Sequence, residues 1–268
     1  MPELSDLLPP EAVRVDLPAG DWREAVTLAG SLLTATGAAE DAYTSEMIVN
    51  VEENGPYIVI APGLAFAHAR PSPAVRRTGL SFVRLARPVE FGHESNDPVS
   101  LVVGLAARDS GDHTAAMAAL AGRLADPEVS AALRTVRTAR EAHALLTAPP
   151  ASPTGTPAAP ASGAGAAAAG EALGHHHLLT VCGNGVGTSL FLKSTLEKVL
   201  ERWGWGPYVS VEATDTISAK GKAGAAQAVL TSREIARTLG DVGIPVRVVG
   251  DFTSTTEVDR VLRDLYDV

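Results

Sequence analysis

The stretch LLTVCGNGVGTSLFLK, Leu178–Lys193, contains the only cysteine of the 268-residue chain. Its first residues, Leu178–Val181, form an apolar run that predicts a buried strand ending just before Cys182. Glycines follow the cysteine, and a helix-like sequence begins at Thr188. A strand, a glycine-rich turn and a helix in this order are typical of a parallel α/β sheet, in which ligands bind beyond the carboxyl ends of the strands. Cys182 is therefore expected at a ligand-binding edge.

The sequence after this stretch repeats the same order. Strand-like segments are expected at 208–213, 228–231 and 246–249, and helix-like segments at 188–202, 232–239 and 256–265. Parallel strands joined by helices wind in one hand and place helices on both faces of the sheet. We therefore predict that residues 175–268 form a small, four-stranded, parallel, doubly wound α/β domain.

The loop after Cys182 has the composition of an anion site. Its glycines allow a tight turn with exposed backbone N–H groups, and Thr188 or Ser189 can cap the helix that follows. A helix N-terminus favours the thiolate form of a cysteine and attracts phosphate. We expect Cys182 to carry a phosphoryl group, with a buried structural cysteine as the alternative. The predicted phosphate-binding residues are Gly183, Asn184, Gly185, Val186, Gly187, Thr188 and Ser189.

Two other phosphate-binding loops fit this stretch less well. Thr188 stands where cysteine phosphatases carry an arginine, and a hydroxyl stabilises far less transition-state charge than a guanidinium. The P-loop of nucleotide hydrolases needs a lysine where this chain has Gly187. A cysteine phosphatase with an accessory domain remains an alternative, and release of free phosphate from an aryl phosphate would identify it.

Residues 148–174 divide the chain in two. They are almost all Ala, Pro, Gly, Ser or Thr, so they have little side-chain mass to bury and are predicted to be a linker. The preceding half, 1–147, alternates helix-like segments at 22–37, 39–53, 114–124 and 128–138 with strand-like segments at 57–61, 80–85 and 99–105. Such alternation predicts a layered α/β fold.

The segment GPYIVIAPGLAFAHARP, residues 55–71, places His68 after an apolar run and a Pro-Gly turn. A neutral imidazole is a nucleophile that can hold a phosphoryl group as a labile N–P bond. Taken alone, a histidine in an apolar setting is more often a structural residue. Arginines that could offset the charge of a phosphate follow it: Arg70, Arg76, Arg77, Arg84 and Arg87.

Both halves resemble components of the sugar phosphotransferase system. The segment headed by CGNGVGTS, residues 178–268, is similar to the enzyme IIB domain of the ascorbate/galactitol class, which carries phosphate on the cysteine of this loop. GPYIVIAPGLAFAHARP, TGLSFVRL and FGHESNDPV resemble the enzyme IIA domain of the mannitol/fructose superfamily, most closely its ascorbate-type branch. This resemblance implies a mixed-sheet α/β sandwich for residues 1–147. It also implies that His68 accepts phosphate from the carrier protein HPr, and that His113, in SGDHTAAMAAL, orients a phosphoryl oxygen.

The resemblance has departures. Ala67 stands where many members have proline, and NVEENG lacks the Arg-Glu pair of mannitol-type members, so the roles of Glu52 and Glu53 are left open. His93 is a weaker candidate that could be a structural loop residue. Neighbours on an extended chain point to opposite sides, so the run His175–His177 is expected to be solvated and not a metal site. We read His143 as a surface helix residue.

Composition narrows the class of protein. The net charge is −9 without a basic tail, which argues against binding to nucleic acid. A single cysteine excludes an internal disulfide and fits a reducing compartment. No apolar run approaches the roughly 20 residues that span a bilayer. We expect a soluble cytoplasmic protein, held at the inner face of the plasma membrane only through a partner.

The predicted function is that of a fused phosphoryl carrier. Phospho-HPr would phosphorylate His68, His68 would pass the group to Cys182 during transient docking, and Cys182 would pass it to a sugar bound by a separate membrane enzyme IIC. An ascorbate-like sugar is what the family implies, and neither a metal nor a cofactor is expected. A regulatory phospho-acceptor module is a further alternative, although the acidic charge and the lack of a helix-turn-helix pattern argue against it.

Overall fold

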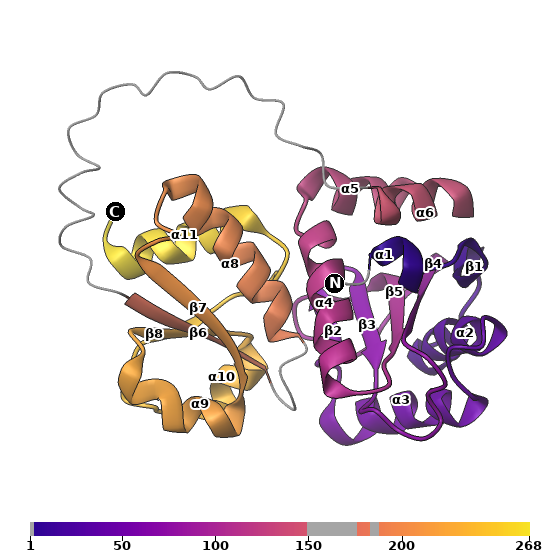
Figure 1. The fold of residues 1–268 in the computed structure, drawn as a ribbon, viewed down its shortest axis with the longest axis horizontal. Coiled ribbons are helices and arrows are strands. Elements are labelled where there is room, and N and C mark those ends of the chain that lie inside the picture. The colour runs from indigo at the N-terminus through magenta and orange to yellow at the C-terminus, as the bar shows by residue number, and fades with distance from the viewer. Residues whose placement is uncertain (1–2, 149–175, 183–187) are drawn as a thin grey trace.

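The computed structural model describes residues 3–148, 176–182 and 188–268. It shows two α/β units side by side (Figure 1). Beyond Ala148, the predicted linker at 148–174 lies outside the described residues. Across the described ranges, no helix combines the length and the hydropathy that crossing a bilayer requires.

A mixed five-stranded sheet forms the centre of the first unit, in the order β1-β4-β5-β3-β2. Parallel pairs are β1–β4 and β3–β5, and antiparallel pairs are β4–β5 and β2–β3. The mixed sheet confirms the expected fold class, although β1 and β3 were not predicted as strands. The strands are β1 (Val13–Leu17), β2 (Val59–Ala61), β3 (Leu64–His68), β4 (Gly79–Val89) and β5 (Val99–Ala106).

Helices cover both faces of this sheet. α2 (Trp22–Ala35) and α3 (Asp41–Asn54) pack on one face. The other face carries α1 (Leu4–Leu7), the 3-10 turn η1 (Pro10–Ala12), α4 (Ser110–Leu124), α5 (Pro127–Thr135) and α6 (Ala139–Thr147).

The predicted helix at 128–138 is α5, which ends at Thr135, and α6, which follows it, was not predicted. Asp126 caps α5, and Pro127 occupies its first turn, as expected. The chain leaves helical geometry at Val136, where ψ is 138°. Thr138 then starts α6 with a capping box that it forms with Glu141.

The alternation of side chains along β3 decides where His68 points. Leu64 and Phe66 belong to the apolar cluster on the α4 face, whereas Ala65 and Ala67 belong to the cluster under α2 and α3. Successive side chains of a strand point to opposite faces. His68 therefore lies on the α4 face, which is also the face toward the second unit (Figure 1).

The second unit is built around a four-stranded sheet, in the order β7-β6-β8-β9, in which all pairs are parallel. This confirms the predicted doubly wound domain. Its strands are β6 (His176–Cys182), β7 (Val209–Asp215), β8 (Ala228–Thr231) and β9 (Val246–Val248). α8 (Ser189–Trp203) and α11 (Thr255–Tyr266) cover one face. The other face has α9 (Thr216–Lys222), which was not predicted, the 3-10 turn η2 (Ala223–Ala225) and α10 (Arg233–Leu239).

The two units pack through α4 and α8, which lie side by side at the centre of the molecule (Figure 1). The rings of Phe66 in β3 and Phe191 in α8 meet edge to face, with centroids 5.4 Å apart. Lys198 in α8 donates from Nζ to the carbonyl oxygen of Gly122 in α4 at 2.8 Å, and burial lowers the pKa of this lysine. Buried apolar residues of both units form one continuous cluster across this boundary.

Candidate functional site

His68 ends β3 and is only 7% exposed. Its Nδ1 lies 2.9 Å from the carbonyl oxygen of Phe66. A carbonyl only accepts, so Nδ1 carries the hydrogen and Nε2 keeps its lone pair. Burial lowers the pKa of His68, and the bond to Phe66 only partly opposes this effect. The imidazole is therefore held in its neutral, nucleophilic form.

His113 lies beside His68, as the resemblance implied. It sits in the first turn of α4, and the two imidazole centroids are 5.3 Å apart. Burial, followed by the proximity of His68, lowers the pKa of His113 to about 4. Asp112 fixes this turn by accepting from the Thr78 hydroxyl at 2.6 Å. Nδ1 of His113 is buried and has no hydrogen-bond partner among the described residues. The structure thus places an unsatisfied nitrogen on the ring that neighbours His68.

Sequence reasoning missed the residues that hold His68 in place. Nδ2 of Asn50 donates to the carbonyl oxygen of His68 at 3.0 Å and to the hydroxyl of Tyr57 at 2.5 Å. The Tyr57 ring meets the His68 ring edge to face at 5.9 Å, and burial raises the pKa of Tyr57 to about 12. Tyr43 bonds to the backbone of Ala69 through its hydroxyl. Asn50 and Tyr43 are two turns apart on α3, so they share one face of the helix. The signal available in the sequence was the spacing of Asn50 and Tyr43, which puts a polar and an aromatic side chain on the same helix face.

Cys182 ends β6 and is 4% exposed. Its Sγ donates to Oγ of Ser189 at 3.4 Å. Burial raises the pKa of the Cys182 thiol, and its hydrogen bonds with Ser189 and Thr188 lower the pKa by less. The expectation of a favoured thiolate is therefore wrong for this packed arrangement, because desolvation outweighs the polar contacts.

The expected capping by Thr188 and Ser189 also differs in the structure. Thr188 precedes α8 in a right-handed helical conformation and makes no side-chain capping bond. Ser189 directs its hydroxyl toward Cys182 and the carbonyl oxygen of Thr214 instead. Both residues thus contact the thiol, and their predicted role in phosphate binding stays a prediction. The other predicted phosphate-binding residues, Gly183, Asn184, Gly185, Val186 and Gly187, lie outside the described residues.

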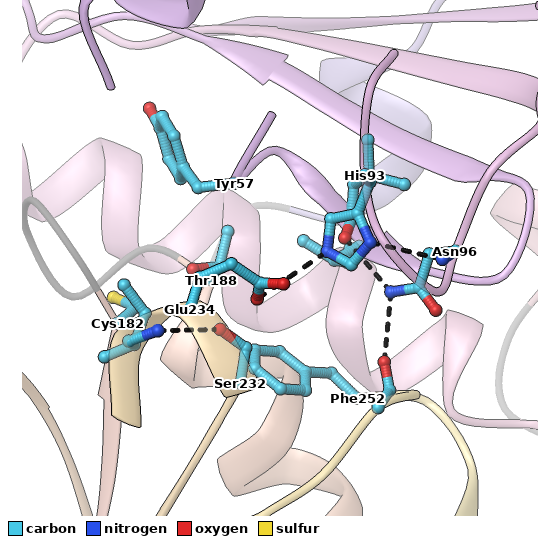
Figure 2. Close-up of a pocket in the computed structure, with 12 residues that line it drawn as sticks. Tyr57, His93, Asn96, Cys182, Thr188, Ser232, Glu234 and Phe252 are labelled. Carbon is cyan, nitrogen blue, oxygen red and sulfur yellow. Dashed lines mark hydrogen bonds and ion pairs between the residues drawn. The ribbon is translucent and has the colours of Figure 1, made fainter. Parts of the chain in front are cut away.

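Cys182 lines a small cavity between the two units (Figure 2). The cavity has a volume of about 20 Å³, which is room for about one water molecule. Tyr57 lines it and also contacts the His68 ring, whereas His68 is not among the described lining residues. The first unit also contributes Val59, Ile60, His93 and Asn96, and the second contributes Thr188, Ser232, Glu234, Ile235, Gly250 and Phe252.

The remaining polar candidates have structural partners. His93 is buried, and its Nδ1 accepts from the backbone N–H groups of Ser95 and Asn96, so it does serve as a loop residue. Glu52 pairs with Arg23, a basic partner from α2. Glu53 lines an open groove that also includes Arg70, the arginine nearest His68 in sequence.

The two other histidine predictions also have outcomes. His143 is more than a surface residue, because its Nε2 donates to the carbonyl oxygen of Leu8 at 3.0 Å. His177 contacts the hydroxyl of Ser210 and the carboxylate of Glu212. Within residues 3–148, 176–182 and 188–268, no group of three or more His, Cys, Asp or Glu is placed to hold a metal ion. His175 lies outside these ranges.

Relatives of the first unit are EIIA components of the phosphotransferase system (PTS). The ascorbate-specific PTS system EIIA component of Salmonella typhimurium (strain LT2) is 44% identical over 102 residues, 38% of this chain and 66% of that protein. The protein of the same description from Escherichia coli (strain K12) is 39% identical over 132 residues, 49% of this chain and 86% of that protein. The chain thus spans slightly less than two thirds of the Salmonella protein.

A solved structure shares the fold of the first unit. The mannitol-specific cryptic phosphotransferase enzyme IIA of Escherichia coli superposes with a TM-score of 0.51 at 30% identity, covering 55% of this chain and 99% of that one.

Family models account for both units. Residues 177–264 match the lactose/cellobiose-specific IIB subunit of the PTS. Residues 6–148, more than half of the chain, match the EIIA 2 family of the phosphoenolpyruvate-dependent sugar phosphotransferase system. With His68 and His113 paired at one strand end and Cys182 at another, the chain belongs to this EIIA 2 family and joins to it a IIB segment.

Proposed function

We propose that this protein is a two-site phosphoryl carrier that passes a phosphoryl group from HPr to His68, then to Cys182, and then to a sugar bound by a separate membrane enzyme IIC. The observation that carries this proposal is that both nucleophiles end strands at one interface, with Tyr57 in contact with the His68 ring and lining the cavity of Cys182. The names of the EIIA relatives favour an ascorbate-like sugar.

In the first step, the Nε2 lone pair of His68 attacks phosphorus while the bond to the donor breaks. The hydrogen on Nδ1 stays bonded to the Phe66 carbonyl, and this contact stabilises the positive charge that the ring acquires. His113, as a neutral imidazole with its ring hydrogen on the unpartnered Nδ1, donates to a phosphoryl oxygen. Catalysis here consists of positioning and charge stabilisation, as is general for phosphoryl transfer.

In the second step, Sγ of Cys182 attacks the phosphorus held by His68. The S–P bond forms as the N–P bond breaks, and His68 leaves in its neutral form. Because burial raises the pKa of the thiol, loss of the thiol proton to solvent must accompany or precede the attack. We expect the second step, and not the first, to accelerate as the pH rises above neutral.

The sugar step requires the two units to separate. A cavity of about 20 Å³ has no room for a sugar beside Cys182 in the docked arrangement. We therefore assign the segment 148–174 the role of a linker between a carrier domain at 1–147 and one at 175–268. A linker of this kind keeps the two sites at an effective concentration of the order of mM.

Isotope transfer from phospho-HPr to the full chain tests this proposal. His68→Ala should abolish label on both sites. Cys182→Ser should retain acid-labile label on His68 and block onward transfer, and mixing the two variants should restore transfer to Cys182 at a rate that depends on concentration. Label that reaches Cys182 in His68→Ala alone would contradict the proposed order.

The same experiment separates the alternatives. A cysteine phosphatase would release free phosphate, and a regulatory module would retain label on His68 even when Cys182 is intact.

A further inference from the structure

The loop of residues 91–97, between β4 and β5, is held in shape by its own side chains. One carboxylate oxygen of Asp97 accepts from the backbone N–H groups of Phe91, Gly92 and His93 at 3.0, 2.6 and 2.7 Å. The buried Nδ1 of His93 accepts from two further N–H groups of the loop. All these contacts lie within the first unit, so the 91–97 loop is pre-formed before any partner docks.

This loop faces the second unit with three polar side chains. Nδ2 of Asn96, which is 4% exposed, donates to the carbonyl oxygen of Gly250 at 3.0 Å. Glu94 accepts from Arg237 of α10 at 2.9 Å. Nε2 of His93 lies 3.9 Å from the carboxylate of Glu234, at the start of the same helix. Figure 2 shows His93 and Asn96 pointing toward Glu234 and the Phe252 region across the cavity.

The rest of the interface discriminates less between partners. The pair Phe66–Phe191 is apolar, and the backbone N–H of Phe252 donates to the carbonyl oxygen of Ile60. Lys198 also crosses the interface, but it bonds to a backbone carbonyl, that of Gly122. Apolar and backbone contacts fit any unit of similar shape. Charged and amide side chains reject a partner that lacks their complement, because buried polar groups are left unpaired or like charges meet.

We propose that the 91–97 loop is the element by which the His68 unit selects the Cys182 unit as its phosphoryl acceptor, with the Glu94–Arg237 pair and the Asn96–Gly250 bond setting the choice. This inference rests on the proposed function for its role in transfer. The part of the proposal that says the loop docks the two units does not rest on that function. His93 and Asn96 of the loop line the cavity in which Cys182 lies, so docking can be followed at Cys182 without any phosphoryl transfer.

The two contacts act differently. Glu94 and Arg237 have side chains that are 53% and 63% exposed, so their pair adds little equilibrium stability but steers encounter and suppresses mismatched partners. Asn96 is buried, and its amide also donates to the carbonyl oxygen of Val59, so it joins the backbones of both units. Disrupting Asn96 should open the interface, and reversing Glu94 should redirect transfer.

Specificity is tested between full-length molecules. The donor is Cys182→Ser, charged on His68 and then freed of HPr, and the acceptor is His68→Ala. The donor is used with and without Glu94→Arg, and the acceptor with and without Arg237→Glu. For each donor, the transfer rate to the acceptor with Arg237 is divided by the rate to the acceptor with Arg237→Glu. This ratio cancels the competition that the donor's own second unit causes. The ratio for the donor with Glu94, divided by the ratio for the Glu94→Arg donor, then isolates the coupling between Glu94 and Arg237.

We expect a quotient of roughly tenfold at low salt, in favour of charge-matched pairs, that shrinks toward one in about 1 M salt, where the Debye length is about 3 Å. Glu40→Arg in the donor is the matched control. Its partner Arg76 lies in the same unit, so it should give a quotient of one. A quotient of one for Glu94→Arg, with label reaching the acceptors, overturns the proposal.

Alkylation of Cys182 in the uncharged chain provides the arm that does not depend on transfer. Asn96→Asp places a carboxylate against two carbonyl oxygens, and their repulsion should separate the units and expose Cys182. Alkylation of Cys182 should therefore accelerate at least fivefold. Glu40→Arg, the control, should leave the alkylation rate unchanged. If no pair of proteins transfers label, the proposed function fails, and this arm alone judges the docking role of the loop. Unchanged alkylation in Asn96→Asp would then overturn it.

Discussion

His68 and Cys182 occupy equivalent places in the two units, yet burial affects them in opposite ways. Each ends a strand, and each is less than a tenth exposed, at 7% and 4%. Desolvation favours the uncharged form of any group. It lowers the pKa of His68 and keeps the base in its reactive form, and it raises the pKa of Cys182 and keeps the acid in its unreactive form. One physical effect thus prepares the first nucleophile and restrains the second.

The polar surroundings of the two sites follow the same division. His68 needs only a carbonyl to hold its hydrogen, which Phe66 supplies. Cys182 needs groups that favour its charged form, and Ser189 and Thr188 are the side chains that the structure places there. In the proposed relay, this contrast makes the transfer from His68 to Cys182 the step that ionisation controls.

Titration of the Cys182 thiol is the most decisive test of the opposite effects of burial on His68 and Cys182. At pH 7 we expect alkylation of Cys182 to be roughly a hundredfold slower than that of an exposed thiol, because reaction needs both opening and ionisation. Ser189→Ala should shift the alkylation midpoint to higher pH, since the Ser189 hydrogen bond lowers the pKa. A midpoint below that of a free thiol would show that burial does not restrain Cys182.

The stability of the protein in acid tests whether burial lowers the pKa of the histidines in the first unit. The pKa of His113 is about 4 in the folded protein and 6.5 as its ordinary value, so the unfolded chain binds an additional proton between these pH values, and stability is lost as the pH falls through that window. The loss should be about 2 kcal/mol at pH 5. His113→Gln should remove this share of the acid slope in urea titrations. Equal slopes for His113→Gln and the wild type would contradict the lowered pKa.

Positioning of His68 is expected to have a smaller effect than its ionisation. Asn50→Ala removes the donor to the His68 carbonyl oxygen and to the Tyr57 hydroxyl. Charging by phospho-HPr should slow about tenfold, as expected from the loss of a buried hydrogen-bond donor. Ser31→Ala, at an exposed position of α2 whose hydroxyl donates to the carbonyl oxygen of Thr27 in the same helix, should stay within about twofold of the wild type. Similar rates for the two variants would remove Asn50 from the site.

The smallest effect is expected at an exposed charge pair of the second unit. Lys222 pairs with Glu212 where both side chains are about 40% exposed. Lys222→Ala should change the free energy of unfolding by about 0.5 kcal/mol or less and leave transfer to Cys182 unaltered. A large fall in transfer would mean that charges distant from Cys182 also set its reactivity.

The sequence was informative wherever local signals are strong. The apolar run before Cys182 and the helix after it predicted β6 and α8, and Asp126-Pro127 predicted the start of α5. Family motifs led to His68 and His113, which the structure places with their rings 5.3 Å apart.

Features that depend on distant partners could not be predicted. β3 was missed because its run is short and apolar, and its identity as a strand depends on pairing with β5 and β2. The role of Asn50 depends on a carbonyl 18 positions away, and the raised pKa of Cys182 depends on burial at the interface between the units. The spacing of Tyr43 and Asn50 on α3 could mark Asn50 as a candidate, but no local pattern encodes which distant groups these residues contact.

The small cavity beside Cys182 has a consequence for the lifetime of the transferred group. An N–P bond of high transfer potential is open to hydrolysis wherever water can approach in line with phosphorus. The docked cavity, at about 20 Å³, admits about one water molecule, and active sites that exclude water suppress such side reactions. In the proposed relay, docking therefore keeps all but about one water molecule away from Cys182, so that a phosphoryl group passing from His68 to this thiol meets little competing hydrolysis.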